Sequence, residues 1–302
     1  MKKILISGGS GFFAINWFLK KKNFYDVTLL LNKHSLKINT KHIYTDICSY
    51  SKLNEVVNKV RPDIIINTAA ITNIETCEKN KRLASQVNYF AAKNISKICE
   101  KKNIHLVHLS TDHLFDGKKK FYTERSYPSP LNNYGITKLK AENIIKKNKN
   151  ACIVRTNFFG WAPKYRKSFS DFVIFSLKQK KKIYLFDDVF ITPIHINYLI
   201  SSIDLILKNS TSGIFNICGS ERISKFSFGK KIAKKLNLNL DLINKTSISN
   251  FSNMVVRPHD MSLSNKKFIN SFNTDIPSLE QQMNILKKEY CNKSYLKIKN
   301  II

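Results

Sequence analysis

Short apolar runs and longer amphipathic stretches alternate along the first half of the chain. The apolar runs, which are typical of buried strands, lie at residues 3–7, 26–31, 63–67, 104–109 and 151–155. Helical periodicity marks the intervening stretches at residues 12–22, 49–60, 80–101 and 134–147. Strands that alternate with helices predict an α/β fold, in which a doubly wound parallel sheet carries helices on both faces.

A glycine-rich turn connects the first predicted strand with the first predicted helix. Glycines let the backbone turn sharply and approach a pyrophosphate, whose negative charge suits the amino end of the following helix. The spacing is Gly-x-x-Gly-x-x-Ala, and Ala14 at its end is small enough for close packing of helix on strand. The turn therefore predicts a dinucleotide site formed by Gly8, Gly9, Ser10, Gly11, Phe12 and Phe13.

The alternation becomes irregular after residue 155. We expect loops at 160–170 and 187–195, helices at 195–208 and 224–236, and a short strand at 214–217. Residues 1–155 are therefore predicted to form the dinucleotide-binding core, and residues 156–302 mainly a substrate-binding lobe, with some segments returning to the core. The ligand crevice of such a sheet lies at the carboxyl ends of its strands.

Two motifs within the core carry candidate chemistry. Tyr134 and Lys138 are four residues apart, so a helix would place both side chains on one face. There the ammonium is expected to lower the pKa of the phenol, which is about 10 when unperturbed, and so to assist proton transfer. Ser110, Thr111 and Asp112 end the preceding apolar run, and either hydroxyl is a candidate to hold a substrate oxygen beside Tyr134. Together with the glycine turn, this order along the chain predicts a catalytic site.

These segments resemble a known family. SGGSGFFA at 7–14, NTAAIT at 67–72, LSTDHLFDG at 109–117 and YGITK at 134–138 resemble the extended short-chain dehydrogenase/reductases. Within that family, the second half of LSTDHLFDG and the later RTNFFG at 155–160 are most similar to the dTDP-4-dehydrorhamnose reductase type. The resemblance implies a Rossmann-like fold and the NADPH-dependent reduction of a 4-keto-6-deoxy sugar nucleotide.

The resemblance also implies roles for single residues. Tyr134 would donate a proton to the carbonyl oxygen, Thr111 would hydrogen-bond the same oxygen beside Asp112, and Lys138 would hold the nicotinamide ribose. Asn88 would support Lys138 through water. Further cofactor contacts are expected from Asp46, Ile47, Ala69 and Ala70, and substrate contacts from Thr72, Asn157 and Arg257. The planar guanidinium of Arg257 matches the oxygens of a diphosphate, although a structural ion pair is the alternative for both Arg257 and Arg155.

The residues that follow the second predicted strand indicate which cofactor is used. NAD sites of this fold place a carboxylate there for the ribose hydroxyls, whereas a 2′-phosphate calls for cationic or neutral donors. This chain has Asn32, Lys33 and His34 at that point. NADP is therefore the expected cofactor, and NAD is disfavoured.

The triplet Thr111-Asp112-His113 bears on the type of reaction. Related 4,6-dehydratases carry Glu in place of this His, so dehydration is disfavoured. Two alternatives to the reductase stay open. One is a sugar-nucleotide epimerase, which would reuse a bound NAD. The other is an NADP-binding protein without turnover that acts as the regulatory subunit of another enzyme.

Composition and charge add exclusions. The formal net charge is +30, but only seven of the 51 basic residues are Arg and the lysines are dispersed, so no specific nucleic-acid site is expected. The six cysteines have no metal-ligand spacing, and no metal is expected. No apolar run reaches the roughly 18 residues of a membrane helix, and the opening segment lacks a signal-cleavage site. We therefore expect a cytoplasmic protein without membrane insertion, for which a homodimer is compatible with the sequence.

Overall fold

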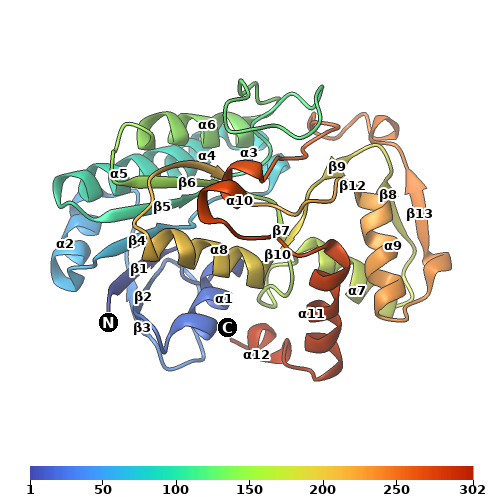
Figure 1. Ribbon diagram of the computed structural model, residues 1–302, viewed down its shortest axis with the longest axis horizontal. Coiled ribbons are helices and arrows are strands. Elements are labelled where there is room, and N and C mark those ends of the chain that lie inside the picture. The colour runs from blue at the N-terminus through green and yellow to red at the C-terminus, as the bar shows by residue number, and fades with distance from the viewer. Residues whose placement is uncertain (302) are drawn as a thin grey trace.

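The computed structural model describes residues 1–301, and a seven-stranded parallel sheet forms its centre (Figure 1). The strands lie in the order β11-β6-β5-β4-β1-β2-β3. They are β1 (Lys3–Ser7), β2 (Asp26–Leu31), β3 (Lys41–Tyr44), β4 (Ile64–Asn67), β5 (His105–Leu109), β6 (Ala151–Arg155) and β11 (Gly213–Asn216). The chain order reverses between β1 and β4, so the carboxyl ends of these two strands flank the crevice in which such sheets bind ligands. The predicted doubly wound α/β fold is confirmed.

Helices cover both faces of the sheet, as the alternation of side chains along β1 shows. Ile4 and Ile6 pack on one face with Trp17 of α1 and Ile203 of α8. Leu5 packs on the opposite face, against residues of α2, α5 and α6. The helices are α1 (Phe12–Lys21), α2 (Tyr50–Val60), α5 (Ala91–Lys101), α6 (Asn133–Ile145) and α8 (Ile196–Lys208). Because both faces are covered, the inner strands are mostly apolar, which is why their positions could be predicted.

The structure departs from the predicted elements at two places in the first half. The edge strand β3 was not predicted, because its burial pattern leaves only Ile43 partly covered and so produces no apolar run. The helix predicted at residues 80–101 is interrupted. It consists of α4 (Lys81–Ala84), the π-helix η1 (Ser85–Phe90) and α5, preceded by the short α3 (Ile74–Lys79). A π-helix keeps helical periodicity only approximately, and the pattern of apolar residues does not distinguish it from α.

The second half of the chain forms a smaller lobe beside the sheet. Helices α7 (Phe169–Lys178), α9 (Lys225–Lys235) and α11 (Leu279–Cys291) enclose an apolar core that includes Trp161, Phe228 and Met283. The late elements β11 and α8 lie with the main sheet, where β11 pairs with β6 and α8 contacts α1. The remaining elements are β7 (Phe158–Phe159), β8 (Ile183–Phe186), β9 (Phe190–Ile191), β10 (Ile194–His195), β12 (Ile223–Ser224), β13 (Ile243–Thr246), α10 (Lys266–Phe272), α12 (Leu296–Lys299), η2 (Leu240–Leu242) and η3 (Ile248–Asn250).

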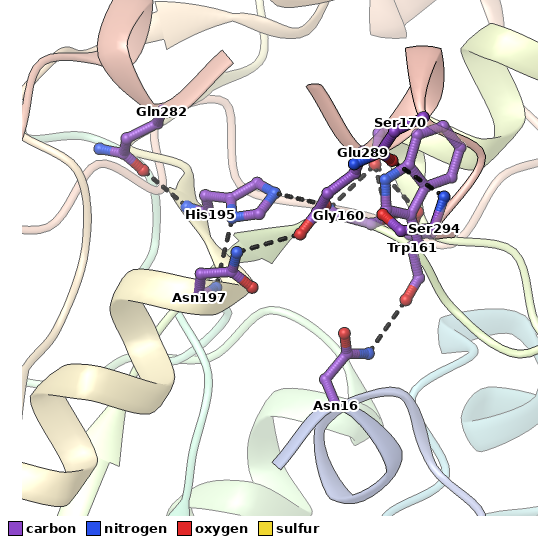
Figure 2. A network of polar contacts seen from close by, with 11 residues as sticks. Asn16, Gly160, Trp161, Ser170, His195, Asn197, Gln282, Glu289 and Ser294 are labelled. Carbon is purple, nitrogen blue, oxygen red and sulfur yellow. Dashed lines mark hydrogen bonds and ion pairs between the residues drawn. The ribbon is translucent and has the colours of Figure 1, made fainter. Parts of the chain in front are cut away.

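Polar contacts join α11 to the sheet side of the molecule (Figure 2). The backbone N–H of His195 donates to Oε1 of Gln282 over 2.6 Å, and Nδ2 of Asn197 donates to Oε1 of Glu289 over 3.0 Å. Burial lowers the pKa of His195 to about 3, so its ring is neutral. A buried polar group left unpaired costs about 1–3 kcal/mol, so these contacts fix how α11 sits on β10 and α8.

Candidate active site

A cavity of about 290 Å³ opens at the carboxyl ends of β1, β4, β5 and β6. The predicted site residues in its walls are Gly11, Phe12, Phe13, Ala70, Thr72, Thr111, Asp112, Tyr134, Lys138 and Asn157. Its other lining residues are Thr68, Leu109, Ser110, His113, Thr156, Phe158, Ala162, Arg166, Lys167 and Ser168. The fold therefore brings the glycine turn and the Tyr-Lys pair, which are more than 100 residues apart in sequence, to one cavity.

The glycine turn has no room for side chains. Gly8 has φ +67°, and a Cβ there would lie 2.9 Å from the backbone of Ala69. A Cβ at Gly9 would lie 2.8 Å from the Leu30 carbonyl oxygen, and one at Gly11 would lie 2.9 Å from that of Gly8. Helix α1 follows with no acidic side chain in its first turn, so its amino end presents uncompensated positive partial charge. Backbone and helix together fit the pyrophosphate of a dinucleotide.

The start of α6 places Tyr134 against the loop that carries Thr111. The Asn132 side chain caps this helix by accepting a hydrogen bond from the Gly135 N–H over 3.0 Å. Gly135 packs so closely on the loop that a Cβ would collide with the His113 carbonyl oxygen. The rings of His113 and Tyr134 meet edge to face, with centroids 5.6 Å apart. A larger residue at position 135 would move Tyr134 away from Thr111.

The acidity of Tyr134 differs from the expectation. Burial raises the pKa of the phenol to about 12, although the Thr111 hydroxyl and the Arg166 guanidinium act in the opposite direction. Lys138 is not among the groups that lower it. The expected lowering of the phenol pKa by Lys138 is therefore not met, because the cost of burying a phenolate outweighs the nearby positive charge.

Lys138 is itself buried and bound to the end of β5. Its Nζ donates to the Leu109 carbonyl oxygen over 2.6 Å and lies 3.1 Å from Nε2 of His108. Burial lowers the pKa of this ammonium to about 8, against the opposing charge of Glu142. Lys138 is thus a cation held at the cavity wall by strand β5.

Asp112 orients two neighbouring polar groups. Its Oδ1 accepts from the Thr111 hydroxyl over 3.2 Å, and its Oδ2 accepts from Nδ2 of Asn157 over 2.5 Å. Burial raises the pKa of this carboxyl to about 6. The Thr111 oxygen keeps a lone pair and is held beside Tyr134 in the same cavity wall.

Three residues singled out by the sequence lie outside the lining of the cavity. Asn88 lies outside the cavity lining, where Oδ1 accepts from the Ile71 N–H over 2.8 Å and Nδ2 donates to the Thr137 hydroxyl over 3.1 Å. Asn88 thus ties the loop after β4 to α6, the helix that carries Lys138. Arg257 forms an ion pair with Glu75, also outside the lining. Arg155 forms a buried ion pair with Glu142, which gives it a structural role.

The residues expected around the adenosine lie at the ends of β2 and β3. Asn32, Lys33 and His34 follow β2 as exposed residues. Asn32 and Asp46 line one shallow hollow, and Oδ1 of Asp46 accepts from the Cys48 N–H over 2.9 Å. Ile47 is partly buried against the core beneath the same strands.

Several residues near the cavity were missed by reasoning from sequence. His108 and Asn67 sit within apolar strands, where a single polar residue resembles noise in the pattern. Tyr165 and Arg166 lie in an irregular loop that has no motif. The scarcity of arginine in the chain was a usable signal for Arg166. Among the described residues 1–301, no group of three His, Cys, Asp or Glu side chains is placed to hold a metal ion, and no helix has the length and apolarity to cross a bilayer.

Comparison with known proteins gives relatives over nearly the whole chain. The dTDP-4-dehydrorhamnose reductase of Salmonella typhimurium is 25% identical, over 92% of this chain and 94% of the relative. The structure of the dTDP-4-dehydrorhamnose reductase of Bacillus anthracis in complex with NADP is 28% identical, with a TM-score of 0.85, over 96% of this chain and 100% of the other. Methionine adenosyltransferase 2 subunit beta of Mus musculus is 26% identical, over 78% of this chain and 73% of the relative.

A family model extends this likeness to residues 1–291, which is almost the full chain. It matches both the strand-turn-helix segment that carries the glycines and the later lobe that closes the cavity. The resemblance to the dTDP-4-dehydrorhamnose reductase type is therefore confirmed. The chain belongs to the family described as the RmlD substrate binding domain.

Proposed function

We propose that this protein is an NADPH-dependent reductase of a 4-keto-6-deoxy sugar nucleotide. The observation that carries the proposal is that Thr111, Tyr134 and Lys138 line one cavity with the glycine turn. Relatives named dTDP-4-dehydrorhamnose reductase, one of them in complex with NADP, support the reaction and the cofactor. NADPH supplies a hydride to the substrate carbonyl when it is bound.

The residues around the cavity fit this cofactor from end to end. The turn from Gly8 to Phe13 would hold the pyrophosphate, while Lys33 and His34 would face the 2′-phosphate. Asp46 and Ile47 would contact the adenine, with Ala69 and Ala70 against the ribose and pyrophosphate. Lys138 would hold the nicotinamide ribose. The backbone of Ala69 lies so close to the glycine turn that a Cβ added at Gly8 would be 2.9 Å from it.

Tyr134 is the proton donor in this proposal. Its pKa of about 12 keeps the phenol protonated at neutral pH, which is the state that a donor needs before the carbonyl is reduced. The Thr111 hydroxyl, which donates to Asp112 in the structure, would turn its proton to the same oxygen and stabilise the charge that develops on it.

Thr72, Asn157 and Arg257 are proposed substrate contacts of different kinds. Thr72 and Asn157 line the cavity and would face the sugar. Arg257 lies beyond it, paired with Glu75, and Nε of its guanidinium is buried without a hydrogen-bond partner. A diphosphate would satisfy this nitrogen and compete with Glu75 for the guanidinium.

The neighbourhood of His113 argues against dehydration. Elimination needs a second acidic side chain beside Asp112, and burial instead lowers the pKa of His113 to about 3, so its ring is neutral. Its Nδ1 is buried without a hydrogen-bond partner, and the residue lines the cavity. A reductase needs only the carbonyl, a hydride and the donor, and these residues provide the donor.

A regulatory role is the second candidate function, because one relative is methionine adenosyltransferase 2 subunit beta. The two functions are separated by a screen of NADPH oxidation with dTDP-, UDP- and GDP-linked 4-keto-6-deoxy sugars. Turnover with a member of this panel supports the reductase. NADPH binding without turnover across the panel favours the regulatory subunit.

We further propose a cytoplasmic location and a homodimer. All six cysteines are free, which suits a reducing compartment. Two copies related by a twofold axis are the commonest assembly of such enzymes. Light scattering on the purified protein and fractionation of the source cells test these two statements.

A further inference from the structure

A short loop crosses the mouth of the cavity and is fixed at its base. Residues 163–167, here called the strap, connect Ala162 to Ser168. Oδ2 of Asp171 accepts from the N–H groups of both flanking residues, over 3.0 Å from Ala162 and 3.1 Å from Ser168. The Arg166 N–H closes a turn within the strap by donating to the Pro163 carbonyl oxygen over 2.9 Å. Both ends of the strap are therefore held by the same side chain of the small lobe, that of Asp171.

The residues next to the strap are anchored as well (Figure 2). Ser170 donates from Oγ to the Gly160 carbonyl oxygen over 2.8 Å, and the Trp161 carbonyl oxygen accepts from Nδ2 of Asn16 over 3.0 Å. Asn16 belongs to α1, the helix that follows the glycine turn. Because both ends are held, the position of the strap is set by the fold and its side chains have defined targets.

Tyr165 fastens the strap to two parts of the proposed cofactor site. Its hydroxyl donates to the Ser10 carbonyl oxygen in the glycine turn over 2.5 Å. Its ring stacks on that of His34 after β2, with centroids 4.1 Å apart and planes inclined by 29°. Tyr165 thus bridges the residues that would hold the pyrophosphate and the 2′-phosphate, along the outer edge of the site.

Arg166 fastens the strap on the substrate side. Its Nη2 donates to the Thr72 hydroxyl over 2.7 Å, and its side chain lines the cavity together with Tyr134. Lys164 and Lys167 flank the pair, so three of the five residues in the strap are cationic. Such a charge density suits a loop that closes over an anionic nucleotide.

We propose that Tyr165 and Arg166 are positioning residues of the reductase, with Tyr165 retaining the bound cofactor and Arg166 bringing a fixed positive charge to the proton donor. This inference rests on the proposed function. It assigns two roles to one loop, because Tyr165 contacts Ser10 and His34 at the proposed cofactor site, whereas Arg166 lines the cavity with Tyr134. Neither residue belongs to the motifs that identify the family.

The charge of Arg166 acts on Tyr134 among a small set of titratable neighbours. Asp112 and Cys77 face the phenol from the loop after β5 and from α3, and both raise its pKa, whereas Arg166 lowers it. His113 packs on the ring and is neutral. Lys138 is one turn along the same helix, and Lys225 acts on Asp112 and His113 from α9. Arg166 thus lines the cavity with Tyr134 and lowers the pKa of its phenol.

The first experiment measures NADPH binding without turnover. Stopped-flow release and calorimetric titration are compared for the parent, Tyr165→Phe, Tyr165→Ala and the control Tyr184→Phe, which changes an exposed tyrosine of β8. We expect Tyr165→Ala to release NADPH about tenfold faster, and Tyr165→Phe, which keeps the stack but loses one hydrogen bond, about threefold to fivefold faster. The control should match the parent. Release from Tyr165→Ala at the parent rate would overturn the role of Tyr165.

The second experiment uses the pH profile of the reverse reaction, oxidation of the sugar-nucleotide alcohol with NADP⁺. There Tyr134 must lose its proton, so the rate at saturating NADP⁺ rises with pH, and the loss of the Lys138 charge near pH 8 is common to the parent and the variants. We expect Arg166→Met to move this rise to higher pH, because a charge that stabilises the phenolate is gone, and Arg166→Lys to restore part of the shift. Arg125→Met, which changes an exposed arginine outside the cavity, is the control. A lower rate with an unmoved profile would mean that Arg166 is only structural.

These results are distinguishable from failure of the proposed function. If the parent binds no NADPH and reduces no keto-sugar, the reductase proposal itself is wrong. If the parent binds and turns over while Tyr165→Ala and Arg166→Met behave like it in both experiments, only the inference about the strap is wrong. Circular dichroism of each variant checks that the fold is retained.

Discussion

Nζ of Lys138 lies 3.1 Å from Nε2 of His108, and both side chains are buried. On its other side, Nδ1 of His108 lies 2.9 Å from the Asn67 amide, which in turn contacts the Ser7 hydroxyl. A polar chain therefore runs from β1 through β4 and β5 to the candidate site. Burial and the Lys138 charge hold the pKa of His108 well below its usual range, so the ring is neutral.

The Lys138 ammonium predicts an alkaline loss of activity. Burial lowers the pKa of Lys138 to about 8, so the positive charge is present below that pH and is lost as the pH rises through it. We expect kcat/KM for keto-sugar reduction, and the affinity for NADPH, to fall above pH 8. Both are measured between pH 6 and about 10, where Tyr134 stays protonated. Lys138→Met should have a flat, low profile over this range, and a parent profile that is flat to pH 10 contradicts the assignment.

Replacing the proposed proton donor tests the chemistry directly. Tyr134→Phe removes one hydroxyl and keeps the ring that packs on His113, so folding and NADPH binding should survive. Turnover should fall by about 10²–10⁴-fold, which is typical of losing a positioned general acid. Steady-state kinetics with the sugar nucleotide found in the panel give the result. Reduction by Tyr134→Phe at the parent rate would remove Tyr134 from the mechanism.

The sequence predicted that residues which follow a buried strand or begin a helix come together, and Thr111 and Tyr134 do line one cavity. Gly8, Thr111 and Tyr134 each follow or precede a buried strand or helix, and parallel strands bring such positions to one edge. The sequence did not predict the contact between His108 and Lys138, because a polar residue inside an apolar strand does not indicate which side chain it will meet. It also misjudged the pKa of Tyr134, since the cost of burial depends on packing by residues distant in sequence.

Cofactor preference depends on the exposed residues after β2. NAD sites have an acidic ribose ligand after β2, which would repel a 2′-phosphate, and this chain has Lys33 and His34 in its place. NADPH should therefore bind about tenfold more tightly than NADH, a difference of ~1.4 kcal/mol in binding free energy. Lys33→Asp should narrow or reverse this preference. Lys37→Asp makes the same charge change four residues further along and should leave the preference for NADPH unchanged. Calorimetry that finds NADH bound as tightly as NADPH by the parent would sink the prediction.

The large positive charge predicts only weak contact with nucleic acid. Seven of the 51 basic residues are Arg, and the lysines are dispersed, so any DNA affinity should come from phosphate contacts alone. Such binding should weaken by about 10³-fold between 50 and 200 mM salt and show no sequence preference. Fluorescence anisotropy with two unrelated duplexes measures both properties. Selective binding that persists at physiological salt would show that the lysines form a specific site.

The buried ion pair between Arg155 and Glu142 joins β6 to α6, the helix that carries Tyr134 and Lys138. Its side chains are 3% and 2% exposed, with Nη2 and Oε2 2.7 Å apart, so removing one partner leaves an unpaired buried charge. Glu142→Gln should therefore lower the free energy of unfolding by about 3–5 kcal/mol, whereas the double change Glu142→Leu with Arg155→Met should cost much less. Glu221→Gln breaks a half-exposed pair with Lys231 and should cost under about 1 kcal/mol. Urea unfolding gives all three values.

The same substitution has a second expected effect, at the candidate site itself. Glu142 lies one helical turn from Lys138, and its charge opposes the lowering of the Lys138 pKa by burial. Without that charge the ammonium should lose its proton at lower pH, so the alkaline fall in kcat/KM should move to lower pH in Glu142→Gln. Glu221→Gln should leave the fall near pH 8. If Glu142→Gln loses stability but keeps the parent pH profile, the fall does not arise from Lys138.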